Sequence, residues 1–164
     1  KDQIYQLIDL YTLFYMQFCH PASTDTAFWT HQMGKPRQNT WYGLAFERIC
    51  MLHIPQIKQQ LGIAQIYTEY YSWRSKLSTP ASQIDLLIER ADNLVNLCEI
   101  KYSQAPYSIT KEEDMRIRTR IADFVGETKI RHGVLTTLIT TFGLRPNPYS
   151  SIAQVQLTMD DLFV

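Results

Sequence analysis

The segment that decides the fold is Gln83-Ile84-Asp85-Leu86-Leu87-Ile88-Glu89-Arg90, followed closely by Leu94-Val95-Asn96-Leu97-Cys98-Glu99-Ile100-Lys101. Both runs are apolar and rich in strand-forming residues. They are separated by Ala91-Asp92-Asn93, a short turn of the kind that joins neighbouring antiparallel strands. We therefore predict a β-hairpin at the centre of the fold.

Charged side chains interrupt both apolar runs: Asp85 in the first, and Glu99 and Lys101 in the second. Residues two apart in a strand share a face, so Glu99 and Lys101 should point to one side, and a hairpin can bring Asp85 beside them. Two carboxylates and one lysine on a sheet can hold a hard divalent cation and activate water. The alternative is a Glu99–Lys101 salt bridge on a solvated sheet face, with Asp85 merely nearby.

The composition of the 164 residues indicates a globular protein, with 45% hydrophobic and 20% charged residues. Sixteen basic and sixteen acidic residues cancel, so nucleic-acid binding would need a local basic surface. No apolar run approaches the roughly 20 residues that cross a bilayer, and nothing resembles a secretion signal. We expect a cytoplasmic protein without membrane contact, whose cysteines are reduced core thiols: Cys19, Cys50 and Cys98.

The segments before the hairpin are predicted to be mainly helical. An aromatic stripe with helical spacing over residues 4–18 predicts a helix that ends near His20-Pro21. The polar stretch from 21 to 40 is predicted to be a loop. Residues 41–61 form a second helical pattern that Pro55 should kink or split, and residues 66–73 are rich in strand formers.

After the hairpin, Thr110 is a credible N-cap with Glu113 in capping-box position, which predicts a helix from Lys111 to about Thr128. Apolar stretches at 134–142 and 155–159 predict two further strands. The resulting order of helix, three strands, helix and strand predicts an α/β (α+β) fold, a mixed sheet flanked by helices. We expect an N-terminal helix and loop over residues 1–40 and the sheet-containing core over residues 41–164.

This order, with Asp85 on the second strand and Glu99-Ile100-Lys101 on the third, resembles the PD-(D/E)XK phosphodiesterase superfamily, which includes many restriction endonucleases. The chain also looks like the C-terminal nuclease-like domain of a group of prokaryotic AAA-type ATPases. The residues that carry this second resemblance are Trp41–Arg48, Gln83–Ile88, Leu97–Tyr102 and Asp161–Phe163. It implies that the chain is part of a longer protein and that ATP would bind only in the absent N-terminal part.

The resemblance implies Mg²⁺- or Mn²⁺-dependent hydrolysis of a phosphodiester in nucleic acid, with DNA the expected substrate. Lys101 would orient or deprotonate the attacking water, and Gln83 could position it. The metal would be held by oxygen atoms, as Mg²⁺ prefers. The expected ligands are Asp85, Glu99, the Ile100 carbonyl and a glutamate on the preceding helix, Glu47.

Three functions remain open at this point. The first is a nuclease, and its phosphate-facing patch would consist of Arg116, Arg120, Lys129 and Arg131. The second is a catalytically inactive nuclease-fold module that binds DNA or docks on its own ATPase domain. The third is oligomerisation, through the aromatic helix near the N-terminus or the apolar C-terminal tail.

Overall fold

The computed structural model describes residues 7–19 and 24–163. The chain divides into two compact units, Lys1–Leu52 and His53–Val164. The expected boundary at residue 40 falls inside a helix, because α3 runs without a break over Pro36–Leu52. Residues 4–6 of the predicted first helix lie outside the described part of the chain.

The first unit is helical and is organised by aromatic rings. It contains α1 (Leu10–Phe14), which continues as a π-helical turn (η1, Tyr15–Cys19), then α2 (Phe28–Gln32) and α3. Asp9 starts α1 by accepting a 2.7 Å hydrogen bond from the Thr12 amide. Ring centroids lie 5.1–5.9 Å apart in a cluster of four side chains: Phe14, Phe18, Trp29 and Trp41. Two members of the aromatic stripe therefore pack within this unit, whereas its tyrosines, Tyr11 and Tyr15, are exposed.

The predicted loop from 21 to 40 is wrong in part. Within the described residues of this stretch, α2 forms a short helix and α3 already begins at Pro36. Proline is favoured in the first turn of a helix, because its fixed φ suits the turn and its missing amide hydrogen has no helical partner there.

The second unit begins with α4 (Ile54–Gln60), whose first turn contains Pro55. The predicted split of the second helical pattern is therefore confirmed. The strands that follow are β1 (Thr68–Arg74), β2 (Gln83–Arg90) and β3 (Leu94–Lys101). Next come α5 (Lys111–Thr128), β4 (Gly133–Thr140) and β5 (Val155–Thr158), with short 3₁₀ turns η2 (Ser150–Ile152) and η3 (Asp160–Leu162).

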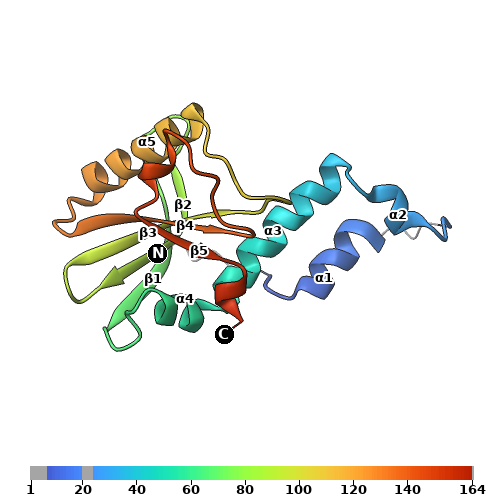
Figure 1. Ribbon diagram of the computed structural model, residues 1–164, viewed down its shortest axis with the longest axis horizontal. Coiled ribbons are helices and arrows are strands. Elements are labelled where there is room, and N and C mark those ends of the chain that lie inside the picture. Colours follow the sequence, from blue (N-terminus) through green and yellow to red (C-terminus); the bar gives the residue numbers. More distant parts are fainter. Residues whose placement is uncertain (1–6, 20–23, 164) are drawn as a thin grey trace. The chain divides into compact units, whose positions relative to one another are not determined.

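The sheet has the order β1-β2-β3-β4-β5. The pairs β1–β2 and β2–β3 are antiparallel, and the pairs β3–β4 and β4–β5 are parallel. The predicted mixed sheet flanked by helices is confirmed. In Figure 1, α5 lies across one face of the sheet and α4 lies on the other side. The parallel strands end in register, since Lys101 pairs with Thr140 and Thr140 pairs with Thr158. The loops after these strands therefore start from one edge of the sheet.

A β-bulge interrupts β2 next to its predicted functional residue. The pairs Tyr71↔Leu87 and Trp73↔Ile84 set two steps along β1 against three steps along β2. Ile84 and Leu87 consequently face the same core cluster, although residues three apart in a regular strand point to opposite faces. Asp85 lies inside this bulge.

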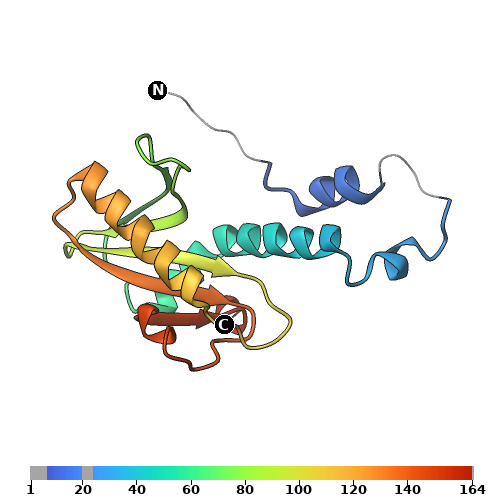
Figure 2. The ribbon, with the colours of Figure 1, turned by 90° about the horizontal axis from the view of Figure 1, so that it is seen from above.

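One part of the core of the second unit lies between α5 and the sheet. Phe124 of α5 is fully buried and packs edge-on against Trp73, with centroids 5.5 Å apart. It belongs to a cluster with four buried sheet residues: Ile84, Leu87, Val95 and Leu97. This packing fixes how α5 crosses the sheet, as Figure 2 shows.

The cysteines are free thiols, with Cys50 and Cys98 buried and Cys19 half-buried. Burial, aided by the nearby Glu47 carboxylate, raises the pKa of the Cys50 thiol to about 12. None of the helices in the described part of the chain has the length and apolar character needed to span a bilayer.

Candidate functional site

A buried carboxylate held by two cations forms the centre of the candidate site. Glu99 on β3 is only 8% exposed. Its Oε1 lies 2.6 Å from Lys101 Nζ, and its Oε2 accepts a 2.5 Å hydrogen bond from Arg120 Nη1. Lys101 comes from the same strand face, as the alternation of side chains predicts. Arg120 comes from α5, whose packing brings it over β3.

The electrostatics of Glu99 favour the ionised carboxylate. Burial alone would raise its pKa, but the charges of Lys101 and Arg120 and their hydrogen bonds outweigh burial and lower the pKa below the ordinary range. Glu99 is therefore a carboxylate whose charge is already balanced by protein cations.

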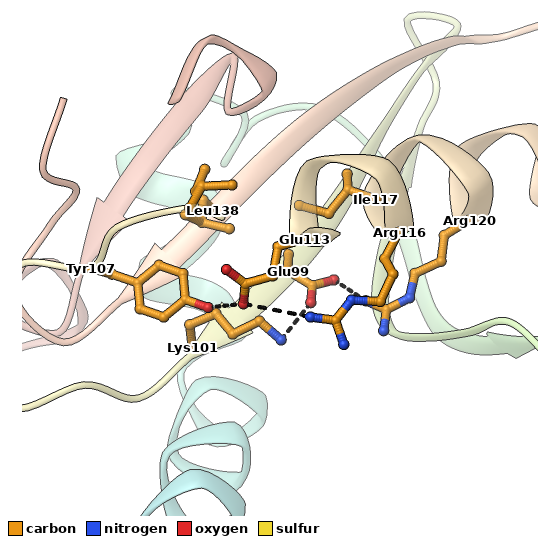
Figure 3. A pocket seen from close by; sticks show the side chains of 9 residues that line it. Glu99, Lys101, Tyr107, Glu113, Arg116, Ile117, Arg120 and Leu138 are labelled. Carbon is orange, nitrogen blue, oxygen red and sulfur yellow. Dashed lines mark hydrogen bonds and ion pairs between the residues drawn. The ribbon is translucent and has the colours of Figure 1, made fainter. Parts of the chain in front are cut away.

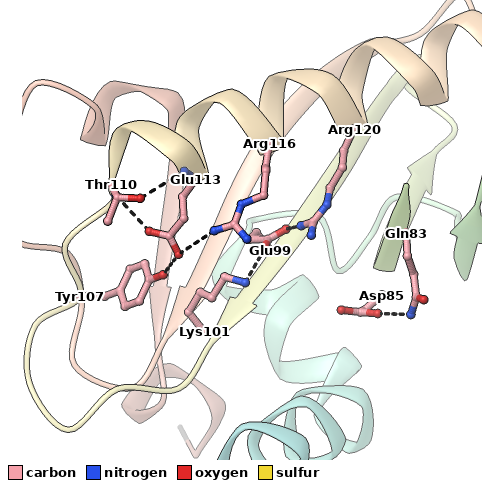
Figure 4. Close-up of polar contacts among 9 residues, drawn as sticks. All are labelled: Gln83, Asp85, Glu99, Lys101, Tyr107, Thr110, Glu113, Arg116 and Arg120. Carbon is pink, nitrogen blue, oxygen red and sulfur yellow. Dashed lines mark hydrogen bonds and ion pairs between the residues drawn. The ribbon is translucent and has the colours of Figure 1, made fainter. Parts of the chain in front are cut away.

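A second polar group lies next to Glu99 and is anchored at the N-terminus of α5. Thr110 and Glu113 form the predicted capping box, in which Thr110 Oγ1 accepts from the Glu113 amide and Glu113 Oε2 accepts from the Thr110 amide. The Tyr107 hydroxyl donates to Glu113 Oε1. Burial first, and then the Glu113 and Glu99 carboxylates, raise the Tyr107 pKa. Figure 4 shows this group beside the Glu99 group.

Both groups line a small inner cavity of about 30 Å³, shown in Figure 3. Its polar lining consists of three cations, two carboxylates and a phenol: Lys101, Arg116, Arg120, Glu99, Glu113 and Tyr107. A cavity of this size has room for one or two water molecules.

Arg116 and Arg120 also line a larger outer groove of about 550 Å³. The groove runs between α5 and the segment 78–83 that leads into β2. The two arginines lie one turn apart on α5, which places them on one helix face. The Arg116 side chain is 66% exposed, and its nearest carboxylate oxygen, Glu113 Oε1, is 4.0 Å from Nη2. Arg116 and Arg120 are thus the residues that line both the cavity and the groove.

The structure does not bring Asp85 into the Glu99 group. Its Oδ1 accepts a 2.8 Å hydrogen bond from Gln83 Nε2, and Figure 4 shows this pair apart from Glu99. The physical reason is the bulge in β2, which ends the regular pairing with β3 at Leu86↔Cys98. Gln83 thus serves as the partner of Asp85.

The other two expected metal ligands are Ile100 and Glu47. Ile100, whose backbone carbonyl is the expected ligand, directly follows Glu99 on β3 and pairs with Ile139 of β4. Glu47 lies on α3 in the first unit. Within residues 7–19 and 24–163, no group of three or more His, Cys, Asp or Glu side chains could hold a metal ion. Both Glu99 oxygens contact protein cations in this arrangement, so a metal ion at Glu99 would have to compete with Lys101 and Arg120.

Of the four predicted phosphate-facing residues, the structure brings Arg116 and Arg120 together. Lys129 is the C-cap of α5, in the left-handed conformation with φ of 56°, and Arg131 follows it. Thirteen residues separate Arg116 from Lys129, which corresponds to roughly 20 Å along the helix axis. The four side chains do not form one patch.

Sequence reasoning missed Tyr107 and the role of Glu113 in the pocket. The capping-box pattern identified Glu113 as a helix-start residue, and this role is confirmed. No sequence signal connects Tyr107 to Glu99. The loop that holds it pairs with the chain after β4, through an isolated bridge between Tyr107 and Leu144.

Comparisons with known proteins leave the function open. No family model matches the chain, and no curated protein matches it. Among solved structures, the crystal structure of a protein of unknown function, AF1548, matches with a TM-score of 0.47 at 15% sequence identity. The match covers 70% of this chain and 64% of that one, so the chain spans less than two thirds of the length of AF1548.

Proposed function

We propose that the second unit is a PD-(D/E)XK nuclease-like module that binds nucleic acid through a backbone phosphate without hydrolysing it. The observation that carries this proposal is the pair of guanidinium groups, Arg116 and Arg120, at the junction of the inner cavity and the outer groove. A guanidinium group matches the geometry of a phosphate and can donate two parallel hydrogen bonds to it.

The charges around this junction favour a phosphate over a metal ion. Lys101 and Arg120 already neutralise Glu99, so a further cation beside them would be repelled. Arg116 is largely exposed, and its nearest carboxylate oxygen is 4.0 Å away. An incoming phosphate can therefore engage Arg116 directly and share Arg120 with Glu99.

The neutral net charge predicts modest affinity with limited salt dependence. Two phosphate contacts on a single strand correspond to a slope of about −1.4 for log K against log salt concentration. A strongly basic nucleic-acid-binding protein would show a much steeper slope.

The test is binding of a fluorescently labelled single-stranded oligonucleotide, measured by anisotropy over a series of salt concentrations. Arg116→Gln and Arg120→Gln should each weaken binding about tenfold, the loss expected for a charged hydrogen bond. Arg131→Gln is the matched control, because it removes the same charge from an exposed position near α5. Equal loss in all three variants, or no binding by the parent, would refute the proposal.

A second candidate is metal-dependent hydrolysis, which the Glu99–Lys101 pair favours because it reproduces the Glu-x-Lys part of the superfamily motif on β3. Its test is plasmid nicking in Mg²⁺ or Mn²⁺ by the parent, Asp85→Ala and Lys101→Ala. Nicking by the parent alone would support hydrolysis. Equal weak nicking by all three proteins would identify a contaminant and exclude this candidate.

A further inference from the structure

The outer groove has features that phosphate binding alone does not explain. Its volume of about 550 Å³ lies in the range of small-molecule pockets, whereas a phosphate needs only the end marked by the two arginines. One wall is the segment 78–83, and the other is the exposed face of α5 around Met115 and Thr119. The groove therefore has room for a group attached to the phosphate.

Hydrogen bonds hold the loop wall of the groove against α5. The Ser82 hydroxyl donates to Asp123, and the Ser75 hydroxyl donates to Glu127. The Lys76 amide donates to the other Glu127 oxygen over 3.1 Å. These contacts tie both ends of the loop to the second half of α5. The loop wall of the groove is thus held in place by contacts within the chain.

The groove lining combines apolar surface with neutral hydrogen-bonding groups. Pro80, Ala81 and Met115 supply apolar surface, and Thr79 and Gln83 supply a hydroxyl and an amide. Carboxylates are also present. Asp123 is engaged by Ser82, and Glu112 lies in the first turn of α5. These acidic groups disfavour a second phosphate along the groove, so the anion is favoured only near Arg116 and Arg120.

We infer that the outer groove is a nucleoside subsite, which takes the base and sugar of one unpaired nucleotide whose phosphate lies between Arg116 and Arg120. This inference rests on the proposed function. Apolar and guanidinium surfaces accept the flat face of a base, and hydroxyl and amide groups can bond its edge. A single-stranded segment or a strand end presents such a nucleotide, because its bases are free to leave the stack.

The test compares three probes with the full chain by calorimetry: inorganic phosphate, deoxyadenosine and deoxyadenosine monophosphate. The monophosphate should bind about tenfold more tightly than inorganic phosphate, the gain expected from burying part of one base against the apolar surface of the groove. Thr119→Trp fills the groove from α5 and should reduce the monophosphate affinity to that of phosphate, with phosphate affinity unchanged. Val125→Phe adds a ring at an exposed position of α5 outside the groove and should change neither affinity. Ala81→Trp repeats the blockage from the loop side.

The outcomes separate this inference from the proposed function. Equal affinity of the parent for phosphate and for the monophosphate overturns the nucleoside subsite and leaves phosphate binding intact. Undiminished monophosphate binding by both folded tryptophan variants overturns the subsite as well. Absence of binding by every probe overturns the proposed function, and the inference fails with it.

Discussion

Replacing Glu99 by Gln tests the central electrostatic claim, which is that a buried carboxylate is stabilised by two cations from different elements. The variant keeps the shape of the side chain and removes its charge, so Lys101 and Arg120 lose their common counter-ion. Removing one partner of a buried ion pair lowers the free energy of unfolding by about 3–5 kcal/mol. Removing one partner of an exposed pair lowers it by about 0–1 kcal/mol.

The expected loss lies between these limits because the three side chains differ in burial. The Glu99 side chain is 10% exposed, whereas the Lys101 and Arg120 side chains are about one third exposed, at 32% and 28%. Water therefore solvates part of each cation after the substitution. We expect Glu99→Gln to lower the free energy of unfolding by about 2–3 kcal/mol near neutral pH, which corresponds to a decrease in Tm of about 10 °C.

The pH dependence provides a sharper check than the magnitude. Because the Glu99 pKa is lowered in the folded state, its contribution to stability is present above the ordinary glutamate pKa of about 4.3 and is lost as the pH falls below that value. Urea denaturation followed by circular dichroism should therefore show a difference between parent and variant that is largest near neutral pH and shrinks in acid. Glu69→Gln, at an exposed strand position, is the control. A difference that is the same at all pH values would refute the reasoning.

Three further predictions concern α5 and its surroundings. Thr110→Ala removes the N-cap and should lower the unfolding free energy by about 1 kcal/mol, with Thr110→Ser restoring most of it; no change on alanine substitution would contradict the capping box. Phe124→Ala should cost about 3–5 kcal/mol in urea denaturation, because the ring is fully buried, and a loss below about 1 kcal/mol would contradict this packing. Tyr107→Phe should leave the absorbance of ionised tyrosine unchanged near pH 10, because the Tyr107 pKa is raised above that ordinary value; a lower signal in the variant would contradict the half-buried hydrogen bond to Glu113.

Local chemistry made several elements of the second unit predictable. Thr110 and Glu113 predicted the start of α5, and the helix spans the predicted Lys111–Thr128. The two apolar runs predicted β2 and β3 with the bounds that the structure shows. In both cases neighbouring residues determine the conformation, so the sequence pattern contains the required information.

The parts that escaped prediction depend on an irregularity or on distant residues. The bulge at Asp85 leaves no mark in the apolar pattern, because Ile84 and Leu87 fit a regular buried strand equally well. The Glu99–Arg120 contact joins residues 21 positions apart and follows from where α5 packs on the sheet. The start of α3 at Pro36 was missed because its first turn is polar and shows no apolar period.

The common edge at which β3, β4 and β5 end has a consequence for engineering ligand preference in this fold. The Tyr107 backbone is tied to the segment after β4 by two hydrogen bonds of 2.8 Å, to the Gly143 carbonyl and from the Arg145 amide. A loop graft after β4 would thus shift Tyr107, and through Glu113 it would disturb the setting of Arg116. The two loops would need to be transplanted as a pair. Both loops begin after the last residue pair of β3 and β4, Lys101↔Thr140. Such a graft would therefore leave the strand register intact.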